Sequence, residues 1–149
     1  MARRKARSKA QPFSIRLRED DDRFVEEEAR RLQRPKGAII EAYASEGIKA
    51  RRFPGISFRG EDYRRRAWAV GTGLDVWEIV ALLRDFGSVK ALAGEYELTE
   101  GQIRIALAYR DAFPEEIDEL VARGRRSPEE ALQRYPFLTT FEHAVSAER

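Results

Sequence analysis

Hydrophobic residues recur at helical spacing along most of the chain, but one stretch near the N-terminus alternates instead. In the sequence PFSIRLR every hydrophobic side chain is followed by a polar one, which sets Phe13, Ile15 and Leu17 against Ser14, Arg16 and Arg18. Such alternation is typical of a half-buried β-strand. No second strand lies next to it in the sequence, so its backbone groups need a partner from elsewhere.

Two helices are predicted directly after this strand. The first begins in the acidic run of residues 19–22, where Asp20 or Asp21 can cap it and negative charge suits the helix dipole. Its hydrophobic face holds Phe24, Val25, Ala29 and Leu32. After a break at residues 33–35, the second helix runs from Lys36 to about Glu46 and turns Ala38, Ile39, Ala42 and Tyr43 inward. Gly47 is expected to cap its C-terminus.

The middle of the chain predicts two short strands and three helices. Ile56 and Phe58 alternate with polar residues, and RRAWAV (residues 65–70) is expected to pair with them. Helices are expected over residues 74–86, which Gly87 ends, and 89–96, which Ser88 caps. Thr99 caps the third helix, and Gln102 completes a capping box.

The C-terminal part predicts a helix from Pro114 to Gly124, a break over residues 125–128, and a further short helix. A hydrophobic cluster follows these helices, at Tyr135, Phe137, Leu138 and Phe141. This segment either folds back onto a core or binds a partner protein and orders on contact.

Composition restricts the chemistry that is open to the chain. Its 149 residues suffice for one domain or two small ones, and it has no cysteine and a single histidine, His143. Thiol catalysis, disulfides and cysteine-ligated zinc are therefore excluded, and we expect a cytoplasmic protein without a cofactor or bound metal. No long apolar run predicts a membrane span, and neither a phosphate loop nor a catalytic triad indicates an enzyme.

Charge is distributed unevenly, although the net charge is only +2. Every charged side chain in residues 1–18 is basic, and the basic arm of residues 1–11 contains Arg3, Arg4, Lys5, Arg7 and Lys9. Such asymmetry indicates either a polyanionic partner or a solubilising tail.

Residues 12–47 resemble the ribbon-helix-helix DNA-binding fold of Arc, MetJ and CopG-type repressors, through FSIRL, the spacing to the second helix and PKGAIIEAYASEG. The resemblance implies a homodimer whose two strands pair as an intermolecular ribbon with a core of Phe13, Ile15 and Leu17. It implies base contacts from Ser14, Arg16 and Arg18, and phosphate contacts from Lys36, Gly37 and the basic arm. The alternative is a surface strand in a small α+β domain.

A second resemblance covers residues 55–120. GTGLDVWEIVALLRDFG and YELTEGQIRIALAYRDAFPEEID are similar to a helix-turn-helix-like domain of bacterial antitoxins of the broad VapB type, which are encoded beside PIN-like ribonuclease toxins. Within it, residues 89–107 resemble a helix-turn-helix whose second helix offers Glu100, Gln102 and Arg104, so either DNA contact or packing is open. The family implies a toxin-binding C-terminus, here Arg125, Arg126 and Arg134 with the four hydrophobic residues of the cluster. We expect an arginine to pair with the carboxylates that hold Mg²⁺ in the toxin.

The chain is therefore expected to be mainly α-helical, with a basic arm (1–11), a ribbon-helix-helix domain (12–48), a linker (49–66), a helix-turn-helix-like antitoxin domain (67–113) and a helical toxin-binding tail (114–149). The expected function is that of an antitoxin that neutralises a PIN-like ribonuclease and represses its own operon by binding operator DNA. The alternative is a free-standing ribbon-helix-helix repressor without a toxin partner.

Overall fold

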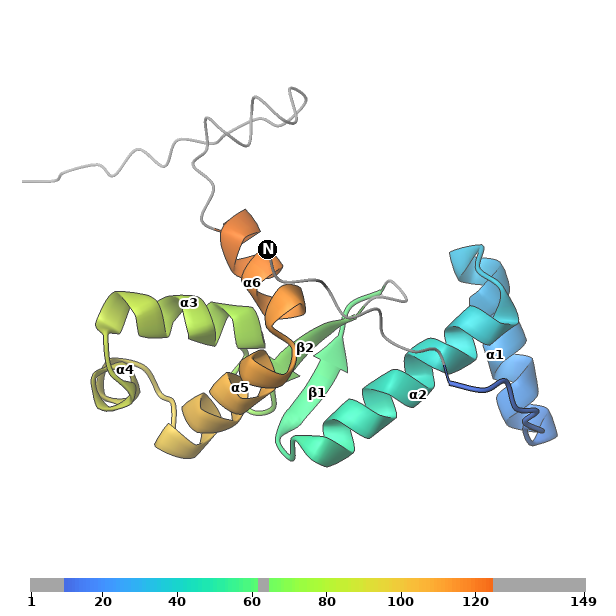
Figure 1. The fold of residues 1–149 in the computed structure, drawn as a ribbon, viewed down its shortest axis with the longest axis horizontal. Coiled ribbons are helices and arrows are strands. Elements are labelled where there is room, and N and C mark those ends of the chain that lie inside the picture. Colours follow the sequence, from blue (N-terminus) through green and yellow to red (C-terminus); the bar gives the residue numbers. More distant parts are fainter. Residues whose placement is uncertain (1–9, 62–64, 125–149) are drawn as a thin grey trace, which may run out of the picture. The chain divides into compact units, whose positions relative to one another are not determined.

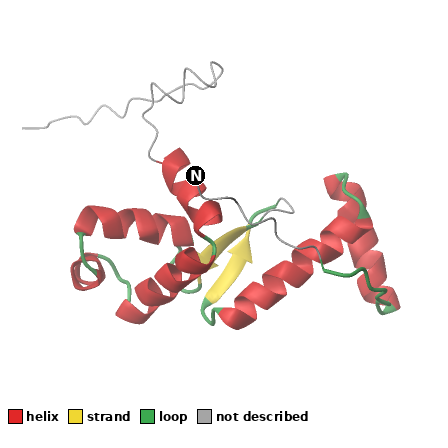
Figure 2. Ribbon diagram, viewed as in Figure 1, coloured by secondary structure: helices red, strands yellow, loops and turns green. Residues whose placement is uncertain are grey.

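The computed structural model describes residues 10–61 and 65–124. The chain divides into two compact units, Met1–Tyr43 and Ala44–Arg149. Six helices account for 65% of the described residues and two strands form a small antiparallel sheet, which confirms the mainly α fold class (Figures 1 and 2). None of the described helices is long and apolar enough to span a bilayer.

Helix α1 (Glu19–Leu32) belongs to the first unit and begins earlier than the acidic residues expected to cap it. Arg18 is its N-cap and makes no side-chain capping bond, so the predicted cap at Asp20 or Asp21 is wrong. Both aspartates lie inside the first turn, where their charge still suits the helix dipole. The helix ends at Gln33, whose φ of 52° is left-handed and whose N–H donates to the carbonyls of Ala29 and Arg30.

Helix α2 (Lys36–Arg52) begins after Pro35, as predicted, but does not end at Gly47. Gly47 has no positive φ and is exposed within the helix, so the predicted C-terminal cap is wrong. The helix continues because residues beyond the glycine have partners in the second unit: Ala50 and Phe53 join its hydrophobic core. The predicted domain boundary after residue 48 therefore falls inside α2, and residues 44–52 of this helix belong to the second unit.

Residues 10–18 form neither helix nor strand in the single chain (Figure 2). The alternating side chains that predicted a strand are exposed, with Phe13 at 84% and Ile15 at 56% of their full accessible surface. Leu17 is half-buried. The ribbon expected here requires a second chain, so the ribbon-helix-helix fold stays a prediction.

The sheet of the second unit pairs the two strands that alternation predicts. Strand β1 (Ile56–Arg59) is antiparallel to β2 (Arg66–Ala69), with Ile56 opposite Ala69 and Arg59 opposite Arg66. The hydrophobic members of both strands, Ile56, Phe58, Ala67 and Ala69, are buried. The polar positions Ser57, Arg59 and Arg66 lie on the opposite face together with Trp68.

Four helices complete the second unit: α3 (Val76–Phe86), α4 (Val89–Glu95), α5 (Glu100–Ala112) and α6 (Pro114–Gly124). The predicted helix-ending and helix-capping residues are confirmed. Gly87 ends α3 with a φ of 77°, Ser88 Oγ accepts from the N–H of Ala91 at 3.1 Å, and Thr99 and Gln102 form the capping box of α5. Helix α3 packs against α4, α5, α6 and β2, and so contacts most elements of the unit (Figure 1).

The hydrophobic core of the second unit draws on all of its elements. Its fully buried members include Val76, Ile79, Leu92, Ile103, Tyr109, Ile117 and Val121. Two of these belong to α6, so residues 114–124, predicted as part of the tail, contribute to this core. Residues 49–66, predicted as a linker, contain the end of α2 and strand β1.

Candidate nucleic-acid interface

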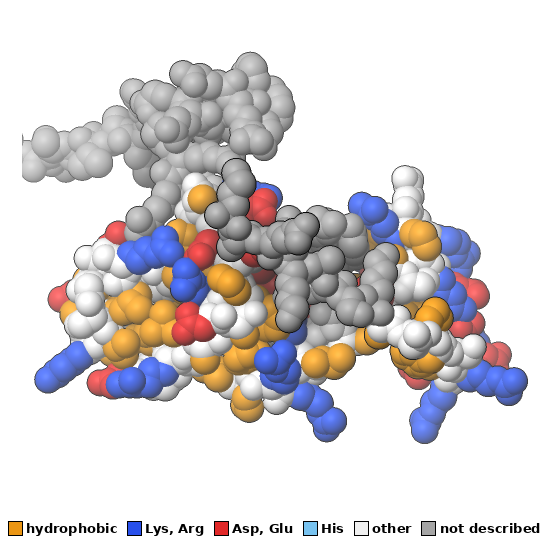
Figure 3. Space-filling model, viewed as in Figure 1, with side chains coloured by type: hydrophobic (Ala, Val, Ile, Leu, Met, Phe, Trp, Pro, Cys, Tyr) orange, Lys and Arg blue, Asp and Glu red, His pale blue; other side chains and the backbone are white. Residues whose placement is uncertain are grey.

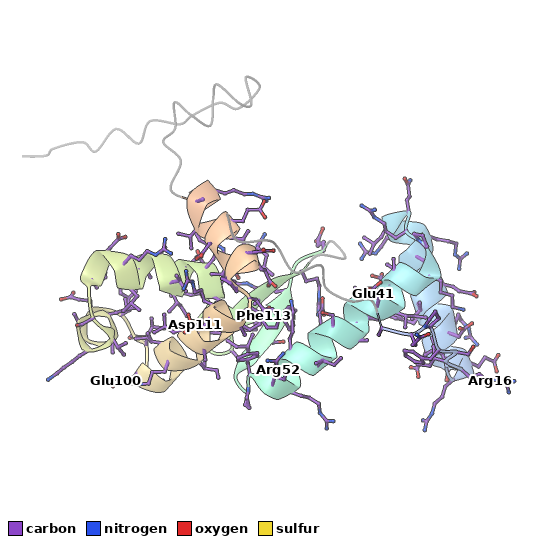
Figure 4. The ribbon with its side chains drawn as sticks, viewed as in Figure 1. Arg16, Glu41, Arg52, Glu100, Asp111 and Phe113 are labelled. Atoms are coloured by element: carbon purple, nitrogen blue, oxygen red, sulfur yellow. The ribbon has the colours of Figure 1, made fainter. Side chains whose placement is uncertain are left out.

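The residues predicted to read DNA bases lie in the N-terminal segment before α1. Ser14, Arg16 and Arg18 are exposed, and Arg16 lies beside the beginning of α1 (Figure 4). They alternate with the exposed hydrophobic side chains of Phe13 and Ile15. The segment therefore offers basic and hydrophobic groups together to whatever binds it.

Lys36, predicted to contact phosphate, lies at the beginning of α2 and is already engaged within the first unit. Its Nζ is 2.5 Å from Asp22 Oδ1 and 3.3 Å from Glu26 Oε1, both on α1. These two carboxylates, Asp22 above all, raise the pKa of the Lys36 amine. A phosphate at this end of α2 has to compete with Asp22 for the lysine.

Gly37, the second predicted phosphate contact, is exposed, and a Cβ atom built on it meets nothing within 4 Å. The following N–H groups, those of Ala38 and Ile39, donate to the carbonyl of Pro35 at 2.9 and 3.3 Å. Gly37 has no side chain that could keep an anion from the backbone N–H groups of Lys36 and Gly37 at this helix end.

The first unit buries few of its hydrophobic side chains. Among its described residues only Val25 and Ile39 are buried hydrophobic side chains. Phe24 and Tyr43, predicted to point inward, are exposed at 55% and 37%, with their ring centroids 6.5 Å apart. Hydrophobic side chains are visible on the surface of this unit in the space-filling view (Figure 3). Two short helices on their own do not provide enough core to cover them.

The helix pair α4–α5, which resembles a helix-turn-helix, uses most of its chemistry internally. Gln102 is bound in the capping box, and Arg104 pairs with Glu100 at 3.1 Å. The inner face of α5 supplies Ile103, Ala106 and Tyr109 to the core. Glu100 begins the helix and Asp111 lies near its end (Figure 4). This arrangement favours packing over DNA contact for α5.

A buried carboxylate that the sequence analysis did not single out joins the sheet to α3. Asp75, the N-cap of α3, is 3% exposed, and its two oxygens accept from Arg59 Nε at 2.6 Å and Arg66 Nε at 2.8 Å. Trp77 Nε1 lies 3.3 Å from the same carboxylate. Glu78 Oε2 accepts from the Asp75 N–H at 2.7 Å, so the D-x-x-E spacing of a capping box marked this site in the sequence.

A second network missed from the sequence ties α2 to α6. Lys49 Nζ is 2.8 Å from Glu116 Oε2, and Tyr109 donates to Glu116 Oε1 at 2.8 Å. The Lys49 amine also lies over the ring of Phe113, 4.4 Å from its centroid. Glu116 thus binds two specific donors in addition to lying in the first turn of α6, where its charge suits the helix dipole.

The remaining predicted site residues lie outside the described part of the chain: the five cations of the basic arm, the tail arginines Arg125, Arg126 and Arg134, and the tail hydrophobic residues Tyr135, Phe137, Leu138 and Phe141. In residues 10–61 and 65–124 no group of three or more histidine, aspartate or glutamate side chains could hold a metal ion.

Comparison with known proteins returns no match for this chain among protein-family models, curated proteins or solved structures.

Proposed function

We propose that the chain is a DNA-binding homodimer that acts as the antitoxin of a PIN-like ribonuclease. One observation carries the DNA-binding half of the proposal: Phe13 and Ile15 are exposed beside exposed Arg16, in a unit whose described part buries only two hydrophobic side chains. A compact piece of about 40 residues or fewer needs oligomerisation, metals or disulfides to fold stably. Since the chain has no cysteine, a second copy is the simplest source of the missing core.

Pairing of residues 13–17 from two chains satisfies both needs of the segment. The two strands give each other the backbone hydrogen bonds that a single strand lacks. The alternation then turns Phe13 and Ile15 towards the helices, and each buried side chain contributes about 1.5–3 kcal/mol. Folding of the first unit and dimerisation become one event.

The same alternation turns the polar residues of the ribbon outward. Arg16 and Arg18 are long enough to reach the base edges of a major groove, where arginine recognises guanine O6 and N7, a contact worth about 1–3 kcal/mol of discrimination. Ser14 donates or accepts at the neighbouring position. The basic arm adds phosphate contacts that depend on salt and not on sequence.

The antitoxin half of the proposal rests on the resemblance of residues 55–120 and on the residues that follow α6. A C-terminal segment with arginines and aromatic side chains suits a carboxylate-rich ribonuclease site, where guanidinium groups replace the metal ion. Under the alternative, a free-standing repressor, this segment has no toxin to bind. Both versions place the protein in the cytoplasm with DNA.

Selection of bound duplexes from a random pool, followed by anisotropy titration of the selected duplex, tests the DNA-binding half. Arg16→Ala is expected to remove the preference for the selected sequence, whereas deletion of residues 1–10 weakens binding to all duplexes and lowers its salt dependence. Equal effects of the two changes would contradict readout by the ribbon.

Affinity purification from the native host, with mass spectrometry of the bound proteins, tests the antitoxin half. The expected partner is a small protein with clustered aspartate and glutamate, bound in stoichiometric amount and released when residues 129–149 are deleted. Recovery of DNA without any protein partner would favour the free-standing repressor.

A further inference from the structure

The outward face of the β1–β2 sheet carries two arginines that lie directly opposite one another. Arg59 and Arg66 are paired in register, and their Nε atoms bind opposite oxygens of one carboxylate, that of Asp75. Trp68, two residues after Arg66 on the same face, lies under the Arg59 guanidinium at 5.1 Å. Both guanidinium groups are therefore held in defined positions.

The charges of this cluster are not equally accessible. Arg59 Nη2 donates to the carbonyl of Gly73 at 3.0 Å and lies 3.9 Å from Glu78, so Arg59 is largely engaged within the unit. The Asp75 side chain is only 4% exposed, whereas that of Arg66 is 53% exposed. Asp75 binds Arg66 through Nε, the inner edge of the guanidinium, and the positive charge faces solvent while its negative partner is buried.

The arginine pairs on helices α3, α5 and α6 lack this asymmetry. Arg104 on α5 pairs with Glu100, whose side chain is itself 52% exposed. Arg84 and Arg110 share Asp118, which is 39% exposed. An approaching polyanion meets the carboxylate of these pairs together with the cation, whereas the carboxylate that Arg66 binds is buried beneath an exposed cation.

We propose that Arg66, positioned by Asp75 and Arg59, contacts a phosphate of duplex DNA, so that the second unit adds a sequence-independent contact through its sheet and not through α5. This inference rests on the proposed DNA-binding function. A guanidinium fixed by its inner edge still presents its outer N–H groups, which suit a phosphate oxygen pair, and little side-chain entropy remains to be lost on binding.

The test measures the salt dependence of binding by the full-length chain to a random-sequence duplex between about 50 and 200 mM salt. Arg66→Gln is expected to lower the slope of log K against log salt by about 0.9 for each bound chain, and to weaken binding about fivefold to tenfold at about 0.1 M salt. Arg104→Gln removes the same charge from α5 and should leave the slope unchanged. Arg66→Lys keeps the charge and is expected to retain the wild-type slope.

Each alternative outcome has a distinct meaning. If Arg66→Gln and the wild type had equal slopes while Arg16→Ala was still impaired in DNA binding, this inference alone would be overturned. Arg66 would then be available to bind an acidic protein surface instead. Loss of the slope in Arg66→Lys as well would show that the paired N–H groups of the guanidinium, and not its charge alone, make the contact, which supports the inference. Absence of DNA binding by the wild-type chain would overturn the proposed function together with this contact. Melting curves of all variants exclude loss through unfolding.

Discussion

The hydroxyl of Tyr109 donates a hydrogen bond of 2.8 Å to Glu116, although the tyrosine ring is completely buried in the core of the second unit. Burial and the negative charge of Glu116 raise the pKa of this hydroxyl well above its usual range. Lys49 binds the other oxygen of Glu116, so the carboxylate joins two donors that lie far apart in the sequence.

Tyr109→Phe is expected to change the alkaline stability of the protein. The folded chain keeps Tyr109 protonated at pH values at which an unfolded tyrosine ionises, so its contribution to stability is complete below about pH 10 and decreases by about 1.4 kcal/mol per pH unit above it. The variant therefore lacks this part of the alkaline decline in stability. At neutral pH its free energy of unfolding is about 0.5–1.5 kcal/mol lower than that of the wild type, because the hydrogen bond is missing. Urea unfolding as a function of pH measures both effects. The matched control Tyr96→Phe, at an exposed ring, should keep the wild-type profile.

Gly124→Ala is expected to destabilise the second unit by about 1–3 kcal/mol. A Cβ atom at this position would lie 2.8 Å from Trp77 Cη2, so either the Trp77 ring or α6 would have to shift. Gly94 in α4 has nothing within 4 Å of such an atom, and Gly94→Ala serves as the control. A thermal or urea midpoint for Gly124→Ala equal to that of Gly94→Ala would contradict the close approach of α6 to Trp77.

Gly47→Ala is expected to stabilise the chain by about 0.5–1 kcal/mol. Gly47 lies in the interior of α2 with nothing within 4 Å of its missing Cβ, and alanine has the higher helix propensity there. If α2 ended at this glycine in a left-handed conformation, the same substitution would be unfavourable. The sign of the change in unfolding free energy therefore reports whether the helix continues past Gly47.

Asp75→Ala is expected to destabilise the second unit by about 2–4 kcal/mol, because it removes a buried carboxylate shared by Arg59 and Arg66. Asp111, an exposed carboxylate on α5 that lies 3.4 Å from Arg110, provides the comparison. Asp111→Ala should cost at most about 1 kcal/mol, as exposed ion pairs do. Denaturant unfolding monitored by tryptophan fluorescence measures both variants. Similar losses of unfolding free energy would show that the Asp75 carboxylate does not stabilise the second unit more than an exposed carboxylate does.

Asp22→Asn is expected to strengthen binding to duplex DNA, because it releases Lys36 from its nearest carboxylate. Asp21→Asn changes the charge of the same turn by the same amount and is the matched control. Anisotropy titration with a random-sequence duplex should show a larger gain for Asp22→Asn, with a steeper salt dependence. Equal gains for both variants would mean that Lys36 contributes no phosphate contact of its own.

Local signals in the sequence predicted most of the second unit. Gly87, Ser88 and the pair Thr99–Gln102 define helix ends through hydrogen bonds that span three or four residues, so the neighbouring residues in the sequence suffice to locate them. The pairing of β1 with β2 followed from alternation over a few residues. Gly47 misled the prediction because a glycine favours a helix end only when the following residues have no packing partner, and Phe53 has one.

Long-range contacts could not be predicted in this way. Lys49 and Glu116 are 67 positions apart, and nothing near either residue specifies the other. The spacing of Asp75 and Glu78 indicates at most a helix cap, and the burial of the Asp75 carboxylate depends on two strands and on Trp77. The exposure of Phe24 and Tyr43 could not be predicted either, because it reflects missing contacts. Both side chains are hydrophobic and lie at helical spacing, but the single chain supplies too little surface to cover them.

The small core of the N-terminal unit determines how the proposed dimer responds to its own abundance. A unit that completes its core only by pairing populates the paired form with the square of the chain concentration when pairs are scarce. Halving the concentration in that range removes about three quarters of the pairs, and occupancy of the proposed operator would fall by a similar factor. The unpaired segment around Phe13 and Ile15 is then open to proteases, which lowers the concentration further. If the proposed function holds, the supply of newly synthesised chain would thus act as the signal that the proposed repressor senses.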